Sequence, residues 1–111
     1  MIYEMNLNPA PFKVMKSGLK TIEMRLDDER RKNIRVGDVI IFTETVTKEQ
    51  LKVEVLGLYR YPTFEELYKH FDKIELGYQK DEIASPSDML EYYPKDKIEK
   101  FGVLGIRIKL I

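Results

Sequence analysis

The sequence Gly-Leu-Lys-Thr-Ile-Glu-Met-Arg, residues 18–25, is the stretch that decides the fold and the candidate site. It starts with a glycine at the end of an expected helix and continues into an expected strand over residues 21–26. Because successive side chains of a strand point to opposite faces, Ile22, Met24 and Leu26 share one face. That apolar face predicts a strand with one side in the core.

The opposite face of this strand is polar. Thr21, Glu23 and Arg25 point the same way along it. Lys20 stands at the mouth of the strand, where its long stem can bring the ammonium group to the Glu23 side. The stretch therefore predicts a cluster of two cations and one carboxylate at nearly fixed spacing.

Other segments have the apolar patterns of strands: residues 3–7, 39–42, 51–61 and 104–110. The continuous apolar run Val39 to Phe42 predicts a strand buried on both faces. Gly57 marks a bend or bulge within its strand. Five or six strands with helices between them, and without strict strand–helix alternation, predict an α+β fold built on a mixed, mostly antiparallel β-barrel.

Short helices are expected between these strands. Asn8-Pro9 is typical of a helix start and Gly18 of its end, and this helix is expected to plug one end of the barrel. The spacing of Thr63 and Glu66 is that of a capping box. Residues 72–84 show no clear period, so a loop or irregular helix is expected there.

Composition limits the class of partner. The 111 residues predict a single domain, residues 1–111, and carry 19 Lys and Arg against 19 Asp and Glu. A balanced charge argues against long duplex DNA, which calls for a basic face, and favours a small ligand or a short single strand. The abundance of Lys, Glu and Ile is typical of thermophile proteins. The oligomeric state is left open by these residues.

Several kinds of chemistry are excluded. There is no cysteine and only one histidine, His70, which rules out disulfides, thiolate zinc sites, cysteine nucleophiles and sites of several histidines. We expect neither a metal nor a cofactor. No signal-peptide pattern and no apolar run of membrane-spanning length occurs, so a cytoplasmic protein without a membrane partner is expected.

Three motifs together resemble the ASCH domain family: Gly-x-Lys-x-x-Glu-x-Arg at residues 18–25, Val-Gly-Asp at 36–38, and Tyr-Pro at 93–94 followed by Gly-Val-Leu-Gly-Ile at 102–106. The resemblance covers essentially the whole chain. It implies a PUA-like barrel, related to PUA and YTH domains, with a cleft suited to RNA or a nucleoside.

Three interpretations of the motif compete. It is a structural ion network, or a ligand site, or a catalytic site. As a ligand site, Arg25 offers a planar fork for a phosphate or base edge, Lys20 a point charge, and Glu23 an acceptor for an exocyclic amino group, with Thr21 on the same face. Tyrosines that could stack a base are Tyr59 and Tyr61, or Tyr92 and Tyr93. We favour the ligand site, which binds RNA or a small nucleoside.

The catalytic interpretation rests on the resemblance. Some small ASCH-type proteins are amidohydrolases that deacetylate N4-acetylcytidine, with a lysine nucleophile at the position of Lys20. Those enzymes carry threonine where Glu23 stands, and a carboxylate there favours the charged, non-nucleophilic lysine. Glu75 and Glu82 are candidates for their further catalytic glutamate, whereas His70 is expected to be structural.

The charged run Asp27 to Lys32 also has two interpretations. Acids first and bases last suit a solvated helical turn on the surface. Alternatively, Arg30, Arg31 and Lys32 contact a phosphate.

Overall fold

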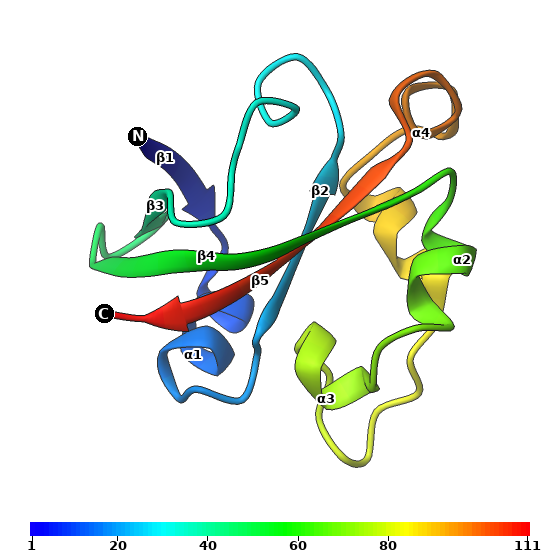
Figure 1. Ribbon diagram of the computed structural model, residues 1–111. Helices are drawn as coiled ribbons and strands as arrows, with labels where there is room; N and C mark the ends of the chain where they lie inside the picture. The colour runs from blue at the N-terminus through cyan, green and yellow to red at the C-terminus, as the bar shows by residue number, and fades with distance from the viewer.

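One five-stranded sheet forms the frame of the molecule. A computed structural model describes residues 1–111, and its sheet has the strand order β1-β3-β4-β5-β2 (Figure 1). The strands are β1 (Ile2–Leu7), β2 (Ile22–Leu26), β3 (Val39–Glu44), β4 (Gln50–Tyr61) and β5 (Val103–Leu110). β1 pairs with β3 in parallel, and the other neighbours are antiparallel. The sheet curls into a half-barrel with short helices between strands, which confirms the predicted mixed, PUA-like architecture.

The half-barrel bends along its longest strand. β4 pairs with β3 through its first residues and with β5 along most of its length. A register shift between Val55 and Gly57 marks a bulge, at the glycine where the sequence predicts one. The bulge lets one strand belong to both halves of the curved sheet.

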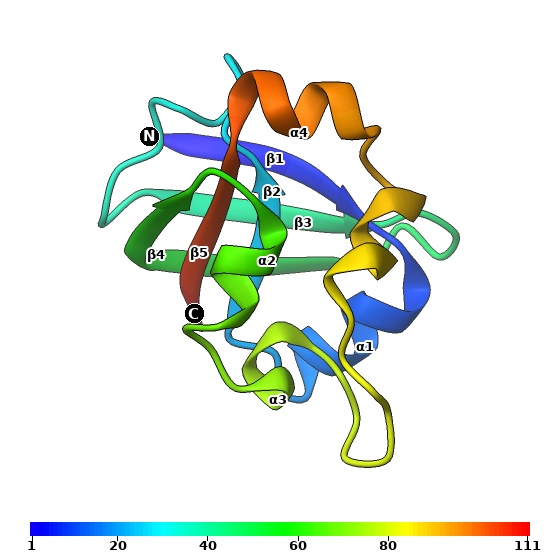
Figure 2. The ribbon, with the colours of Figure 1, turned by 90° about the vertical axis from the view of Figure 1, so that its right-hand side faces the viewer.

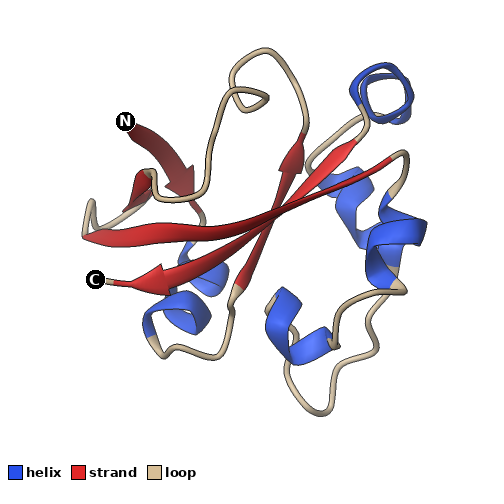
Figure 3. Ribbon diagram, in the orientation of Figure 1, coloured by secondary structure: helices blue, strands red, loops and turns tan.

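The helices are short and unevenly distributed. They are α1 (Pro9–Lys16), α2 (Phe64–Tyr68), α3 (Lys73–Leu76), the 3₁₀ helix η1 (Pro86–Glu91) and α4 (Lys95–Phe101). All except α1 gather at the β2–β5 end of the sheet, as Figure 3 shows. α1 plugs the half-barrel, since its Phe12 and Met15 are buried in the interior. None of the helices is both long and apolar enough to cross a membrane.

The two faces of the sheet carry separate hydrophobic clusters. The barrel core fills the concave interior and consists of Leu7, Phe12, Met15, Ile34, Ile40, Phe42, Val53, Val55, Leu104, Ile106 and Ile108. The helix-side core lies under α2, α3, η1 and α4 and consists of Ile22, Met24, Leu26, Phe64, Leu67, Leu76, Met89, Ile98 and Val103. The apolar face of the motif strand thus packs beneath the helices, while its polar face turns toward the barrel.

One local expectation proves wrong and another is confirmed. β3 is buried on one face only: Ile40 and Phe42 are buried, but Val39 and Ile41 are half-exposed because no helix covers that part of the sheet. The charged run makes the expected helical turn, since the Lys32 and Arg31 amides donate to the Asp28 carbonyl at 2.9 and 3.1 Å. The Asp28 side chain also accepts from the Arg30 amide.

Candidate functional site

The charged residues of the motif form one closed network. Glu23 Oε1 lies 3.3 Å from Lys20 Nζ, and Glu23 Oε2 lies 2.8 Å from Arg25 Nε and 2.7 Å from Arg25 Nη2. Lys20 and Glu23 are only 5% and 4% exposed. We call Lys20, Glu23 and Arg25 the motif network. Its members meet as strand alternation and the long lysine stem predict.

Lys20 is held by groups far apart in the sequence. Its ammonium donates to the Ile22 carbonyl at 3.0 Å and to the Leu76 carbonyl, at the end of α3, at 2.9 Å. The ion pair with Glu23 is its third polar contact. Gly77 makes room for the stem, because a Cβ there would lie 3.1 Å from Lys20 Cδ. The network thus anchors α3 to the motif strand.

Arg25 joins the two edges of the half-barrel. Its Nη2 donates to the Asn6 carbonyl of β1 at 2.7 Å, so a side chain of edge strand β2 reaches edge strand β1. Its guanidinium also lies 6.0 Å from the centroid of the Phe42 ring. Nη1 makes no hydrogen bond within the protein, and it is not among the buried polar atoms that lack a partner. The Tyr93 side chain is a further neighbour of the guanidinium and helps to raise the pKa of Arg25.

The network also sets the protonation of its members. Burial opposes the ionised form of Glu23, but the charges of Arg25 and Lys20 outweigh it and lower the pKa of Glu23. Burial acts against the cation of Arg25, and the charge of Glu23 overcomes it, so the pKa of Arg25 is raised. Burial raises the pKa of Tyr93, which stays a neutral phenol beside them. Glu23 and Arg25 are therefore both charged at neutral pH.

A cavity of about 920 Å³ adjoins the network. In Figure 1, α1 lies to the left of the lower end of β2 and α3 to its right. Residues of α1 and of η1 both line the cavity. The motif network and Met24 line the cavity on the β2 side, and Asn6 and Asn8 line it from the end of β1. The facing wall comes from residues 76–79, 88–89 and 91–93. The charged motif is thus both internally paired and open to a cavity.

Three tyrosines line this cavity: Tyr78, Tyr92 and Tyr93. Tyr92 is 53% exposed. The Tyr78 hydroxyl lies 2.8 Å from Asp88 Oδ2 and 2.7 Å from the Tyr68 hydroxyl, which fixes the wall between α2 and η1. The cavity thus has one exposed tyrosine ring, Tyr92, and one fixed by hydrogen bonds, Tyr78, which suits stacking of a flat ligand.

Other residues proposed from the sequence lie elsewhere. Tyr59 and Tyr61 do not line the cavity: Tyr59 packs against Phe71, and Tyr61 stacks on His70 with ring centroids 5.0 Å apart. His70 lies just beyond the end of α2. The structure therefore brings Tyr93, and not the Tyr59 pair, next to the motif network.

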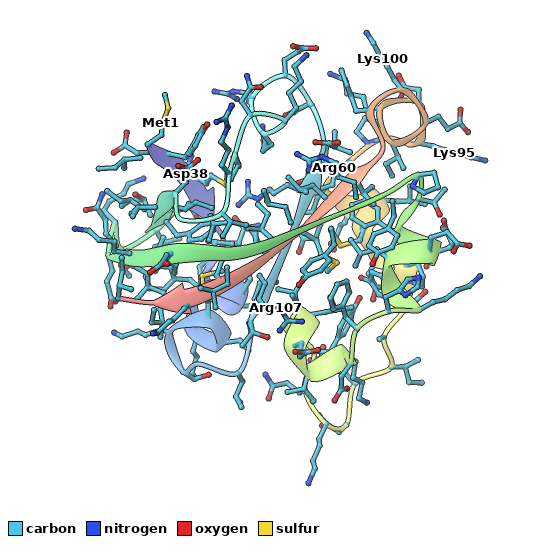
Figure 4. All side chains as sticks on the ribbon, in the orientation of Figure 1. Met1, Asp38, Arg60, Lys95, Lys100 and Arg107 are labelled. Carbon is cyan, nitrogen blue, oxygen red and sulfur yellow. The ribbon has the colours of Figure 1, made fainter.

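A second cluster holds two more of the proposed residues. Glu75 Oε1 lies 3.1 Å from Arg107 Nη1 and 3.5 Å from Thr21 Oγ1, outside the cavity. Figure 4 shows Arg107 between the sheet and α3. Glu82, by contrast, lines the cavity. No group of three or more His, Asp or Glu side chains is arranged to hold a metal ion.

Several cavity residues were missed by sequence reasoning. Leu76, Gly77, Tyr78 and Asp88 lie in or beside the segment without clear period. One signal was present: Asp72 caps α3 through the Ile74 amide, and Gly77 ends that helix with a φ of 107°. An acidic N-cap with glycine five residues later is typical of a single helical turn.

Two solved structures are similar to this protein over the whole chain. The crystal structure of hypothetical protein PH0355 is 32% identical, with a TM-score of 0.80 and coverage of 100% of both chains. The solution NMR structure of protein PF0455 from Pyrococcus furiosus is 31% identical, with a TM-score of 0.71 and coverage of 100% of this chain and 98% of that chain. No curated protein matches the chain.

A more distant structure shares the fold. The crystal structure of ASCH from Zymomonas mobilis is 15% identical, with a TM-score of 0.68, and the match covers 96% of this chain and 65% of that chain. The family model described as ASCH domain matches residues 5–111, which include the motif network and all three cavity tyrosines. The protein therefore belongs to the ASCH domain family.

Proposed function

We propose that the cavity binds an RNA base or nucleoside, with the motif network as a rigid charged floor. The observation that carries the proposal is the state of Arg25. Glu23 and Asn6 hold Nε and Nη2 in place, so the guanidinium is fixed on a residue that lines the cavity, while Nη1 bonds to neither. A positioned guanidinium donor suits the acceptor edge of a base.

The charge of the lining favours a base over a phosphate. Lys13, Lys20 and Arg25 bring three cations, against four carboxylates from Glu23, Glu82, Asp88 and Glu91. The start of α1 offers little to an anion, because Pro9 and Pro11 carry no amide hydrogen. A doubly negative phosphate is thus poorly served inside the cavity.

The facing wall supplies acceptors and a stacking ring. Glu91 has no hydrogen-bond partner within the protein, and Tyr92 beside it is half-exposed. A carboxylate accepts from an exocyclic amino group, as on cytosine or adenine. Glu23 positions Arg25, since both its oxygens already face cations. A base between Arg25 and Glu91, stacked on Tyr92, would use both walls.

Calorimetric titration with cytidine, adenosine and uridine tests the proposal. Tyr92→Ala removes the exposed ring and is expected to weaken binding about ten-fold or more, because base–aromatic stacking contributes about 1 to 3 kcal/mol. Tyr92→Phe keeps the ring and should bind like the native protein. Leu90→Ala is the matched control, since Leu90 is equally exposed nearby but does not line the cavity. Equal affinity in Tyr92→Ala and the native protein contradicts the proposed site.

The alternative is an amidohydrolase, and one observation favours it: Lys20 and Glu82 line the same cavity. Nucleophilic attack requires an accessible lone pair on Nζ, however, whereas Lys20 is only 5% exposed and its Nζ donates to two backbone carbonyls. We therefore expect no release of cytidine from N4-acetylcytidine by the purified protein. Release that disappears in Lys20→Met would establish the enzyme instead.

A further inference from the structure

A second hollow lies directly beside the cavity, and we infer that it holds the backbone phosphate of a single-stranded RNA whose neighbouring base occupies the cavity. The inference rests on the proposed function and deepens it: the ligand is a segment of strand and not a free nucleoside. The second hollow, here called the phosphate groove, has a volume of about 460 Å³. It lies between the turn at residues 27–32 and α4, which meet near the same end of β2 (Figures 1 and 2).

The two hollows share a wall. Tyr92 and Tyr93 line both the cavity and the phosphate groove, and no other residue does. A ligand that stacks on Tyr92 in the cavity therefore needs only to pass this pair to enter the groove. In a single strand, base and phosphate alternate over the same short distance, and aromatic side chains beside cationic grooves are the usual platform for it.

The free charge of the phosphate groove is positive. Its two acids are paired: Asp28 with Arg31 at 3.1 Å and Glu29 with Lys32 at 2.8 Å. Its two cations, Arg30 and Lys97, form no ion pair, and both are exposed.

The groove thus has the sign that a phosphate requires, whereas carboxylates outnumber cations in the cavity. Leu26 and Phe101 give the groove an apolar base on which a sugar can rest. This contrast between adjacent hollows matches the polarity of a nucleotide strand. A nucleoside without phosphate would leave Arg30 and Lys97 unused.

The strand is single and its contact short. Two free cations can neutralise about one or two phosphates, far fewer than a duplex footprint requires. A base enters the cavity only when it is unstacked, as in a loop or an unpaired end. The equal numbers of acidic and basic residues over the whole chain agree with such a limited contact.

The test compares an oligonucleotide with a nucleoside on the same variants. Binding of a 5′-labelled single-stranded RNA hexanucleotide is followed by fluorescence anisotropy over a KCl series, and binding of the best nucleoside by calorimetry. The double variant Arg30→Ala/Lys97→Ala is expected to weaken hexanucleotide binding about ten-fold and to reduce the slope of log K against log salt by about 0.7 to 1.4. Its affinity for the nucleoside should equal that of the native protein.

The matched control is Lys95→Ala/Lys100→Ala. It also removes two positive charges, both from α4, where Figure 4 shows the two lysines. Neither residue lines the groove. The inference is overturned if Arg30→Ala/Lys97→Ala binds the hexanucleotide as the native protein does, or if the control loses as much affinity. The proposed function still stands in either case if the nucleoside binds. Absence of nucleoside and hexanucleotide binding by the native protein overturns both.

Discussion

The barrel core and the helix-side core lie on opposite faces of one sheet, yet they are built from different materials. The barrel core is mostly aliphatic, with Phe12 and Phe42 its only aromatic members. The helix-side core is bordered by six partly buried aromatic residues: Tyr61, Tyr68, Phe71, Tyr78, Tyr93 and Phe101. Strands supply most of the first core, and helices of four to seven residues supply much of the second.

This difference explains where the cavity lies. Helices this short are unstable alone and depend on tertiary contacts, here the hydrogen bonds among Tyr68, Tyr78 and Asp88. Short helices and loops pack irregularly over the helix-side core and leave hollows between them, whereas a continuous sheet leaves none. β2 serves both regions, with its apolar face in the helix-side core and Arg25 over Phe42 of the barrel core. The motif network is therefore the link between a regular core and an irregular one.

The largest expected effect comes from the regular core. Phe42→Ala removes a fully buried ring from β3 and is expected to lower the free energy of unfolding by about 3 to 5 kcal/mol, because it creates a cavity among strands that cannot close it. Urea denaturation measures the change. A loss below about 1 kcal/mol would show that the barrel core is less tightly packed than its burial indicates.

Substitutions in the motif network should lower the free energy of unfolding nearly as much. Glu23→Gln leaves Lys20 and Arg25 buried without a counter-charge, which is expected to cost about 3 to 5 kcal/mol of unfolding free energy. Arg25→Gln retains Lys20 with Glu23 and should cost less. Equal stability of Glu23→Gln and the native protein would contradict a buried charge network.

The pH dependence of stability follows from the same carboxylate. The pKa of Glu23 is lowered in the folded state, so ionised Glu23 stabilises the fold above its unfolded pKa of about 4.3. That stabilisation is lost as the pH falls through the lower folded value. Denaturation at a series of pH values should therefore show a steeper acid loss in the native protein than in Glu23→Gln. Parallel curves would mean that Glu23 does not titrate as described.

A smaller loss of stability is expected from glycine substitutions, and two of them separate backbone strain from contact with Lys20 of the motif network. Gly77→Ala is expected to cost about 2 kcal/mol, because a positive φ of 107° disfavours alanine and its Cβ would press on Lys20. Gly37→Ala is the control: its φ is 94°, but no atom lies within 4 Å of the added Cβ, so strain alone of about 1 kcal/mol applies. Identical losses in the two variants would show that Lys20 yields freely.

The smallest effect is expected on the irregular side. Tyr78→Phe removes hydrogen bonds to Asp88 and Tyr68 and should cost about 1 kcal/mol. Hydrogen exchange should accelerate in η1 and α2 more than in the strands. Tyr3→Phe is the control, because the Tyr3 hydroxyl has no hydrogen-bond partner within the protein. Uniform acceleration over the whole chain would mean that the two cores open together.

Sequence reasoning predicted the parts that follow from local periodicity. Alternation in residues 22–26 placed Ile22, Met24 and Leu26 in a core and Glu23 with Arg25 on the other face, as observed. Alternation does not reveal which faces a helix covers, and β3 was therefore expected to be buried on both sides. Local pattern determines which residues share a face, but cover depends on tertiary packing.

The cavity depends on contacts between distant residues, and most of its facing wall was not predicted. The Leu76 carbonyl reaches Lys20 from 56 residues away, through a one-turn helix without clear period. The choice between Tyr59 with Tyr61 and Tyr92 with Tyr93 also depended on topology, because both pairs flank polar residues in the sequence. Only the structure places Tyr93 next to the motif network.

Chemical-shift mapping by NMR tests directly whether the cavity beside the motif network binds a base. On titration with cytidine, we expect shifts of the backbone amides of Lys20, Gly77, Tyr92 and Tyr93, which surround the cavity. Amides of β4 near Tyr59 and Tyr61, on the other side of the helix-side core, should stay unchanged. Shifts confined to Tyr59 and Tyr61, or no shifts at millimolar nucleoside, would contradict a base-binding cavity above the motif network.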